Sequence, residues 1–127
     1  MSTHRYSAGG GTVDRGSATI WVLLCVSIVL IVAVMGAAVG SVISARQRAQ
    51  SAADLAALGG AAALIAGTVE PCGRARPIAV ANTATVTSCQ ISGDNLLIRT
   101  AASLPAPLAR LGLGPAQASA RAGPDRG

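Results

Sequence analysis

The residues of this chain that could do chemistry include three cysteines, which differ in their surroundings. Cys25 lies inside a long apolar run, where a free thiol behaves as a small hydrophobic side chain. Cys72 and Cys89 lie in a polar part of the sequence. They could form a disulfide, or they could be two unrelated buried thiols. A disulfide between them would stabilise a small domain by about 3 kcal/mol in the chain-entropy model. We predict this Cys72 to Cys89 disulfide, because so small a domain needs a covalent link.

Catalytic, metal and cofactor sites are not predicted. The only histidine is His4, and no pair of cysteines has the C-x-x-C spacing of a metal site. The carboxylates are scattered, at Asp14, Asp54, Glu70, Asp94 and Asp125. No glycine-rich phosphate loop follows a predicted strand. We therefore expect no enzyme activity, no catalytic residue, no metal, no cofactor and no small-molecule substrate.

The positive charge does not point to nucleic acid. The net charge is +5, but all ten basic residues are arginines spread along the chain. Aromatic residues make up 2%, so no basic cluster is interleaved with stacking rings. We expect no nucleic-acid partner.

Two of the arginines flank a long apolar segment. Between Arg15 and Arg46 lie 30 residues without a charge. Its central residues, 18–43, would span about 39 Å as a helix, more than the roughly 30 Å of a bilayer's hydrocarbon core. This segment predicts a membrane helix over residues 16–44, preceded by a tail over residues 1–15.

Two alternatives compete with a membrane helix. A buried core helix would alternate apolar and polar faces, whereas here only Thr19, Ser27 and Ser41 interrupt the central run. A cleaved signal peptide has an apolar region of about 7–15 residues, shorter than this one. Small residues suited to cleavage do follow, at 44–45 and 49–52. A retained single-pass helix is the favoured interpretation.

The orientation of this helix depends on the cysteines. Arg5 and Arg15 on one side balance Arg46 and Arg48 on the other, so the positive-inside rule does not decide. Disulfides persist in oxidising compartments. The predicted disulfide therefore places the C-terminal part outside the cytoplasmic membrane and the N-terminus in the cytoplasm.

Small residues recur along the membrane helix and beyond it. Gly36, Gly40 and Ser44 are each four residues apart, a spacing that lets membrane helices approach closely. The row continues in an alanine-rich extension, residues 45–68, which Gln50 and Asp54 stabilise by an i, i+4 pair. Gly59 and Gly60 mark a weak point or a close backbone approach. The predicted helix-packing residues are Gly36, Gly40, Ser44, Ala45, Ala49, Ala52 and Ala56, with a homo-oligomer as one possible result.

The remaining residues predict a small α+β cap over 69–122, followed by a tail over 123–127. The extension ends near Gly67, and a short helix covers 72–81 with Pro77 tolerable only in its first turn. Alternating strands over 85–91 and 96–100 form a hairpin around a turn at 92–95. After the proline-rich stretch 104–115, residues 116–122 offer a possible third strand.

The sequence resembles the TadE-like pilus-assembly proteins. The resemblance rests on RGSAT at 15–19, the apolar helix, and ARQRAQSAADLAAL at 45–58. The pattern of Cys72, Asn82, Val86, Ser88 and Cys89, with the tail 120–124, is similar to the short actinobacterial branch found near helicase and secretion genes. The resemblance implies a minor pilin-like, or pseudopilin, component of a tight-adherence (Flp-type) pilus or a type II/IV-like secretion system. Its partners would be the membrane, other pilin-like subunits and secretion-platform proteins.

The same resemblance implies a candidate processing site. In the wider family a prepilin peptidase cleaves after a glycine whose fifth following residue is glutamate. Gly16 and Ser17 map onto the cleavage point, but Trp21 occupies the glutamate position. We therefore predict that this chain is not cleaved there.

Two functions from other classes compete with pilus assembly. One is a small anchored or secreted binding domain whose helix is only a tether or signal. The other is a single-span regulator or toxin whose apolar segment is the effector. The small-residue row past the membrane disfavours both, because neither function needs it.

Overall fold

The computed structural model describes residues 15–68 and 70–124. The predicted N-terminal tail, His4 and the last residues of the C-terminal tail lie outside the described residues. Two compact units divide the chain between Gly36 and Ala37, and each is described by itself.

The first unit consists, in its described part, of the beginning of the helix α1, Arg15–Ile65. Residues 16–36 are all exposed, although most are large and apolar. The helix is long and apolar enough to cross a membrane, and none of its most apolar window is buried. A core helix would bury that surface, so the core-helix alternative does not hold for this segment.

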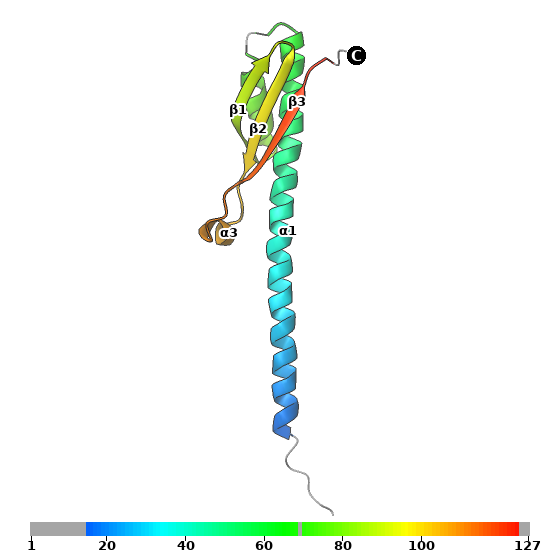
Figure 1. The fold of residues 1–127 in the computed structure, drawn as a ribbon, viewed down its shortest axis with the longest axis vertical. Coiled ribbons are helices and arrows are strands. Elements are labelled where there is room, and N and C mark those ends of the chain that lie inside the picture. Colours follow the sequence, from blue (N-terminus) through cyan, green and yellow to red (C-terminus); the bar gives the residue numbers. More distant parts are fainter. Residues whose placement is uncertain (1–14, 69, 125–127) are drawn as a thin grey trace, which may run out of the picture. The chain divides into compact units, whose positions relative to one another are not determined.

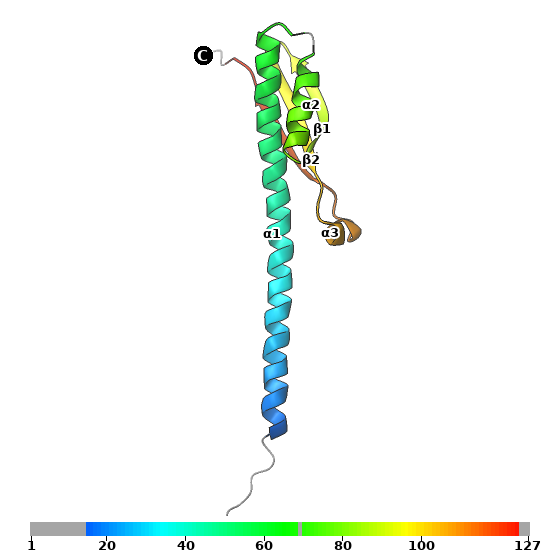
Figure 2. The same cartoon turned by 180° about the vertical axis from the view of Figure 1, so that it is seen from behind.

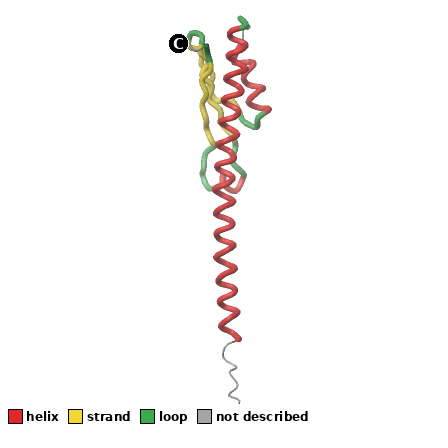
Figure 3. Tube along the Cα trace, turned by 90° about the vertical axis from the view of Figure 1, so that its right-hand side faces the viewer, coloured by secondary structure: helices red, strands yellow, loops and turns green. Residues whose placement is uncertain are grey.

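The second unit contains the rest of α1 and a cap of two helices and three strands (Figures 1 and 2). The cap elements are α2 Pro71–Ala81, β1 Thr85–Ser92, β2 Asn95–Ala102, α3 Ala106–Arg110 and β3 Ala116–Ala122. The strands form one antiparallel sheet in the order β1-β2-β3. Figures 2 and 3 show α1 and α2 on the same face of this sheet. The predicted α+β fold is confirmed, including the third strand.

The core of the second unit lies between that sheet face and the two helices. Alternate residues of β2 are buried, as the period of a strand requires: Leu96, Ile98, Thr100 and Ala102. The fully buried side chains that the helices contribute to the core are small, among them Ala52 and Ala56 from α1 and Ala75 and Ala79 from α2. Small side chains let helix and sheet approach closely, so the unit needs few bulky residues.

Both long helices of the second unit end in the same hydrogen-bond pattern. At the end of α1, the N–H of Thr68 donates to Ala63 O at 2.9 Å around Gly67, whose φ is 71°. At the end of α2, the N–H of Ala84 donates to Ala79 O at 3.0 Å around Thr83, whose φ is 58°. This is the Schellman motif, which favours glycine at the left-handed position. The predicted helix ends at Gly67 and Asn82 are confirmed, but Thr83 adopts a conformation unusual for a β-branched residue.

One local expectation for the cap was wrong. The predicted short helix is confirmed as α2, but Pro77 lies in its interior, beyond the first turn, to which the prediction had limited a proline. The proline-rich stretch before the third strand contains the short helix α3, which begins directly after Pro105. Proline fixes φ near −65° and is compatible with a helix start, so a proline-rich stretch can also form a helical turn.

Candidate functional site

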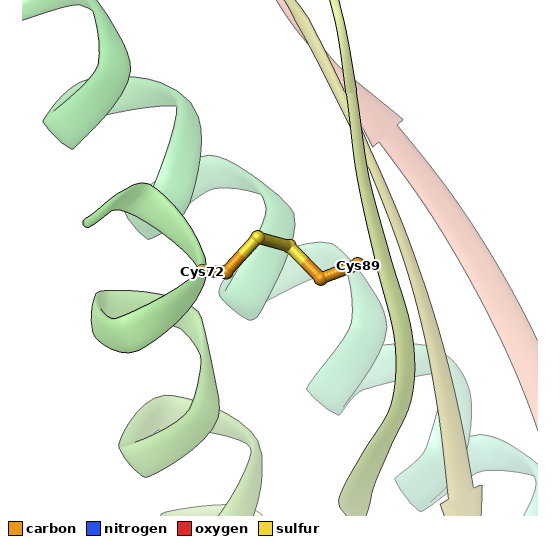
Figure 4. Close-up of a disulfide and its surroundings, with 2 residues drawn as sticks. All are labelled: Cys72 and Cys89. Carbon is orange, nitrogen blue, oxygen red and sulfur yellow. A yellow bond between two sulfur atoms is a disulfide. The ribbon is translucent and has the colours of Figure 1, made fainter. Parts of the chain in front are cut away.

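The disulfide joins α2 to β1. Cys72 and Cys89 are bonded, with their Cα atoms 6.0 Å apart and 17 positions apart in the sequence (Figure 4). Cys25 is free and exposed on the apolar part of α1. The predicted disulfide is confirmed, and it links two elements that flank the core.

A β-bulge directs Cys89 toward α2. Val86 and Cys89 both pack against the core, although their spacing of three would place them on opposite faces of a regular strand. The register with β2 shifts between Val86 and Ser88, so that Thr87 is the extra residue. The bulge therefore allows the disulfide, and the odd spacing of Val86 and Cys89 was the signal in the sequence that could have revealed it.

The predicted packing alanines form one buried face of α1, which we call the alanine face: Ala45, Ala49, Ala52 and Ala56. Three of them, Ala49, Ala52 and Ala56, belong to the core cluster together with Leu96 and Ile98 of β2. The hydroxyl of Thr100 donates a hydrogen bond of 2.7 Å to the carbonyl oxygen of Ala49, and this bond is buried. These alanines are thus packed against the chain's own cap.

The two glycines near the end of α1 are places of close approach. A Cβ atom on Gly59 would collide with Ile78 of α2. A Cβ atom on Gly60 would collide with Leu96 of β2 and would lie 3.2 Å from the carbonyl oxygen of Pro71. The predicted close approach of another backbone is found at Gly60, whereas Gly59 faces the side chain of Ile78.

The earlier members of the small-residue row are in a different environment. Nothing lies within 4 Å of the position of a Cβ atom on Gly36 or on Gly40. Ser44 is half-buried, and its hydroxyl accepts a hydrogen bond of 3.0 Å from Arg48 Nη2. The surface at these glycines is open for another helix, and their packing role stays a prediction.

Sequence reasoning missed the opposite face of α1. Its exposed apolar residues follow helical spacings of three and four, and we call them the leucine stripe: Leu55, Leu58, Ala62 and Ile65. Such spacing is typical of a helix–helix seam. The signal was present in the sequence, because these large side chains alternate with the alanines along the same helix.

A groove lies between α1 and the first residues of β3. Its volume is about 500 Å³, and its lining combines apolar and polar side chains: Ile43, Arg46, Gln47, Gln50, Gln117 and Ala118.

Gln50 Nε2 also donates a hydrogen bond of 3.0 Å to Asp54 Oδ1, which confirms the predicted i, i+4 pair. In the part of the chain that the structure describes, no group of three or more potential ligands could hold a metal ion.

The candidate processing residues lie at the beginning of α1. Gly16, Ser17 and Trp21 are helical and exposed. Trp21 is an apolar side chain, so no acidic group is present at the position that the resemblance assigns to glutamate.

Comparison with protein families gives one match. Residues 16–63 match the family described as putative Flp pilus-assembly TadE/G-like. The TadE-like resemblance is confirmed over this segment. The TadE/G-like segment covers α1 almost from end to end and stops before α2 and the sheet. A pilus-assembly component with an N-terminal hydrophobic helix fits this match, and the family is generally structural rather than enzymatic. No curated protein and no solved structure matches the chain.

Proposed function

We propose that this chain is a membrane-anchored, minor pilin-like component of a tight-adherence (Flp-type) pilus or a related type II/IV-like secretion system. It acts by helix packing and assembly, without catalysis, in the manner of the short actinobacterial TadE-like branch. Its partners are other pilin-like subunits and secretion-platform proteins. A single helix anchors it in the cytoplasmic membrane, with the N-terminus inside and the cap outside.

The observation that carries this proposal is the extent of the TadE/G-like segment. The matched residues, 16–63, include both the apolar part of α1 and the part that carries the alanine face. The alanine face belongs to the core of the second unit, so α1 is an integral part of the cap's fold. A tether would need no such core contacts, which disfavours the alternative of a binding domain on a passive anchor.

The leucine stripe supports assembly through α1. Leu58 and Ile65 remain exposed on the side of the helix that the cap does not cover. Association would bury this apolar surface, at a gain of roughly 25 cal/mol for each Å² removed from water. The stripe is therefore the favoured contact outside the membrane, while Gly36 and Gly40 offer the contact inside it.

The same contacts support retention of the helix against one of the two possible signal-peptide cleavages. Cleavage near residues 49–52 would separate Ala49 from the core, together with the carbonyl that accepts the hydrogen bond from Thr100. We also expect no cleavage after Gly16, because Trp21 replaces the family's glutamate. The intact mass of the membrane-extracted protein tests both statements, since a product beginning at Ser17 would contradict the second.

Charge placed on the leucine stripe tests the assembly role. Leu58→Arg should abolish co-purification with pilin-like and secretion-platform proteins, because a charge would have to be buried at the contact. Val80→Arg on α2 is the matched control, since Leu58 is 62% exposed and Val80 63%. Equal co-purification of the two variants with these partners would remove the proposed stripe contact.

The membrane contact has its own test. Gly36→Leu together with Gly40→Leu should abolish self-association in a membrane two-hybrid assay, because the leucines would prevent close helix approach. An unchanged signal would remove these glycines from the proposed packing surface.

The proposed orientation is tested by labelling intact cells. An impermeant maleimide should modify Cys72 and Cys89 after reduction, because both lie in the cap outside the membrane. Protection of both cysteines would contradict the outward-facing orientation.

A further inference from the structure

The connection between β2 and β3 is unusually apolar for an exposed loop. Residues 103–115, which we call the α3 loop, contain a single charged side chain, Arg110. Leu111 is 76% exposed and Leu113 is 49% exposed. Loop residues exposed to water are commonly polar or turn-forming, so a pair of exposed leucines with few charges nearby needs a partner surface.

Two contacts determine where the α3 loop lies along α1. Leu96, near the start of β2, lies against Gly60 of α1, and Thr100 donates its hydrogen bond to Ala49. The strand therefore runs back along α1 over 11 helical residues, or about 16 Å, toward the beginning of the second unit. Figure 1 shows α3 beyond the end of the sheet in this direction.

The groove beside α1 is independent evidence for which residues of α1 lie level with the α3 loop. The start of β3, which directly follows the α3 loop, faces Ile43 and Arg46 across this groove. Arg46 is the first charged residue after the uncharged run. In a membrane-spanning helix the first arginine after the apolar run lies near the headgroups. If α1 spans the membrane as proposed, the α3 loop lies at the level where water meets lipid.

We propose that the α3 loop is a second membrane contact, lying in the bilayer interface beside α1. Leu111 and Leu113 enter the boundary between headgroups and acyl chains, as the apolar residues of interfacial segments do. Arg110 extends its guanidinium to the lipid phosphates while its methylene groups cover apolar surface. The cap is then held at the membrane surface at two places, which restricts the tilt of α1 relative to the bilayer.

This inference rests on the membrane span of α1, and it is independent of any role in a pilus. The experiment uses the full chain in phosphatidylcholine vesicles whose acyl chains carry bromine either near the headgroup or near the methyl end. Bromine quenches tryptophan fluorescence on contact. The wild-type chain reports the span through Trp21, its only tryptophan.

The loop is then examined in a Trp21→Phe background. The tryptophan of Leu113→Trp should be quenched in vesicles that carry bromine near the headgroup. Its emission should also lie at shorter wavelength than that of a tryptophan in a part of the cap that remains in water. Ile91→Trp is the control for such a position, because Ile91 is 48% exposed against 49% for Leu113 and pairs with Leu96 at the other end of the sheet. Ile91→Trp should keep its emission in all vesicles. Leu111→Trp repeats the test at a second position of the loop.

Each contrary result has a distinct meaning. Quenching in the wild type with none in Leu111→Trp or Leu113→Trp overturns the interfacial loop and leaves the span intact. A shift to shorter wavelength without quenching also overturns it, because protein, such as a second copy, would then cover the loop. Absence of quenching in the wild type overturns the span and the loop together.

Discussion

The two parts of α1 use small residues for different contacts. Before Ala37 every described residue from Gly16 onward is exposed, and Gly36 has open space around it. Beyond Ser44 the alanine face is buried by the chain's own cap, and Gly60 lies directly against Leu96. One helix thus combines a surface available to lipid or another helix with a surface already occupied. Small residues indicate that another segment can pack closely against the helix. Whether that segment belongs to the same chain depends on which part of the helix the cap covers.

Loss of the disulfide should produce the largest difference in stability between the two parts. Cys72→Ser together with Cys89→Ser should lower the free energy of unfolding of the second unit by about 3 kcal/mol, because the unfolded chain regains loop entropy. The helicity of the membrane-embedded part should stay unchanged, since lipid satisfies its apolar surface. Circular dichroism during urea unfolding in detergent micelles measures both. Cys25→Ser is the control, and an equal loss in that variant would contradict the assignment of the effect to the disulfide.

Enlarging an alanine should separate the two surfaces directly. Ala52→Leu should destabilise the second unit by about 2 kcal/mol, because the fully buried site has no room for the added atoms. Ala33→Leu should leave unfolding of that unit unchanged, since Ala33 is exposed in the first unit. Urea unfolding of both variants measures the difference. Tolerance of leucine at both positions would mean that the alanine face is not closely packed.

The hydrogen bond between Thr100 and Ala49 should have a smaller effect. Thr100→Val keeps the shape of the side chain but removes the donor, and should cost about 1 kcal/mol. Thr100→Ser retains the hydroxyl and provides the control for the bond. Thermal unfolding of the three proteins compares them, and a valine variant as stable as wild type would show that the bond adds little to the attachment of β2.

Effects of about 1 kcal/mol or less should come from the two helix ends, where backbone geometry acts without a change in packing. Thr83→Gly should stabilise the second unit by about 0.5 kcal/mol, because relief of the left-handed strain exceeds the added entropy of the unfolded chain. Gly67→Ala should destabilise it by about 1 kcal/mol, because alanine would adopt the strained conformation. Denaturation midpoints measure both changes. Changes of the same sign would contradict this explanation.

Much of the fold could be predicted because its signals are local. The uncharged run indicated the helix, Gly67 and Asn82 indicated helix ends, and alternating β-branched residues indicated the hairpin. The disulfide followed from the position of Cys25, which left Cys72 and Cys89 to pair. In each case neighbouring residues in the sequence determine the structure.

The face of α1 that turns inward could not be predicted in the same way. Ala52 and Leu55 both follow helical spacing, and only the position of the sheet decides which of them is buried. The bulge at Thr87 likewise depends on the register of β1 against β2. These features arise from pairing between distant segments, so their signals in the sequence can be interpreted only once the pairing is known.

The shared core has a consequence for how such a cap can be exchanged between proteins. Because Ala49 and Ala56 of α1 complete the core, the cap cannot be inherited or engineered as a separate cassette that begins after the helix. A chimera joined near Gly67 would set a foreign sheet against an alanine pattern to which it was not fitted. A junction ahead of Ala45 would transfer helix and sheet together and would preserve the core.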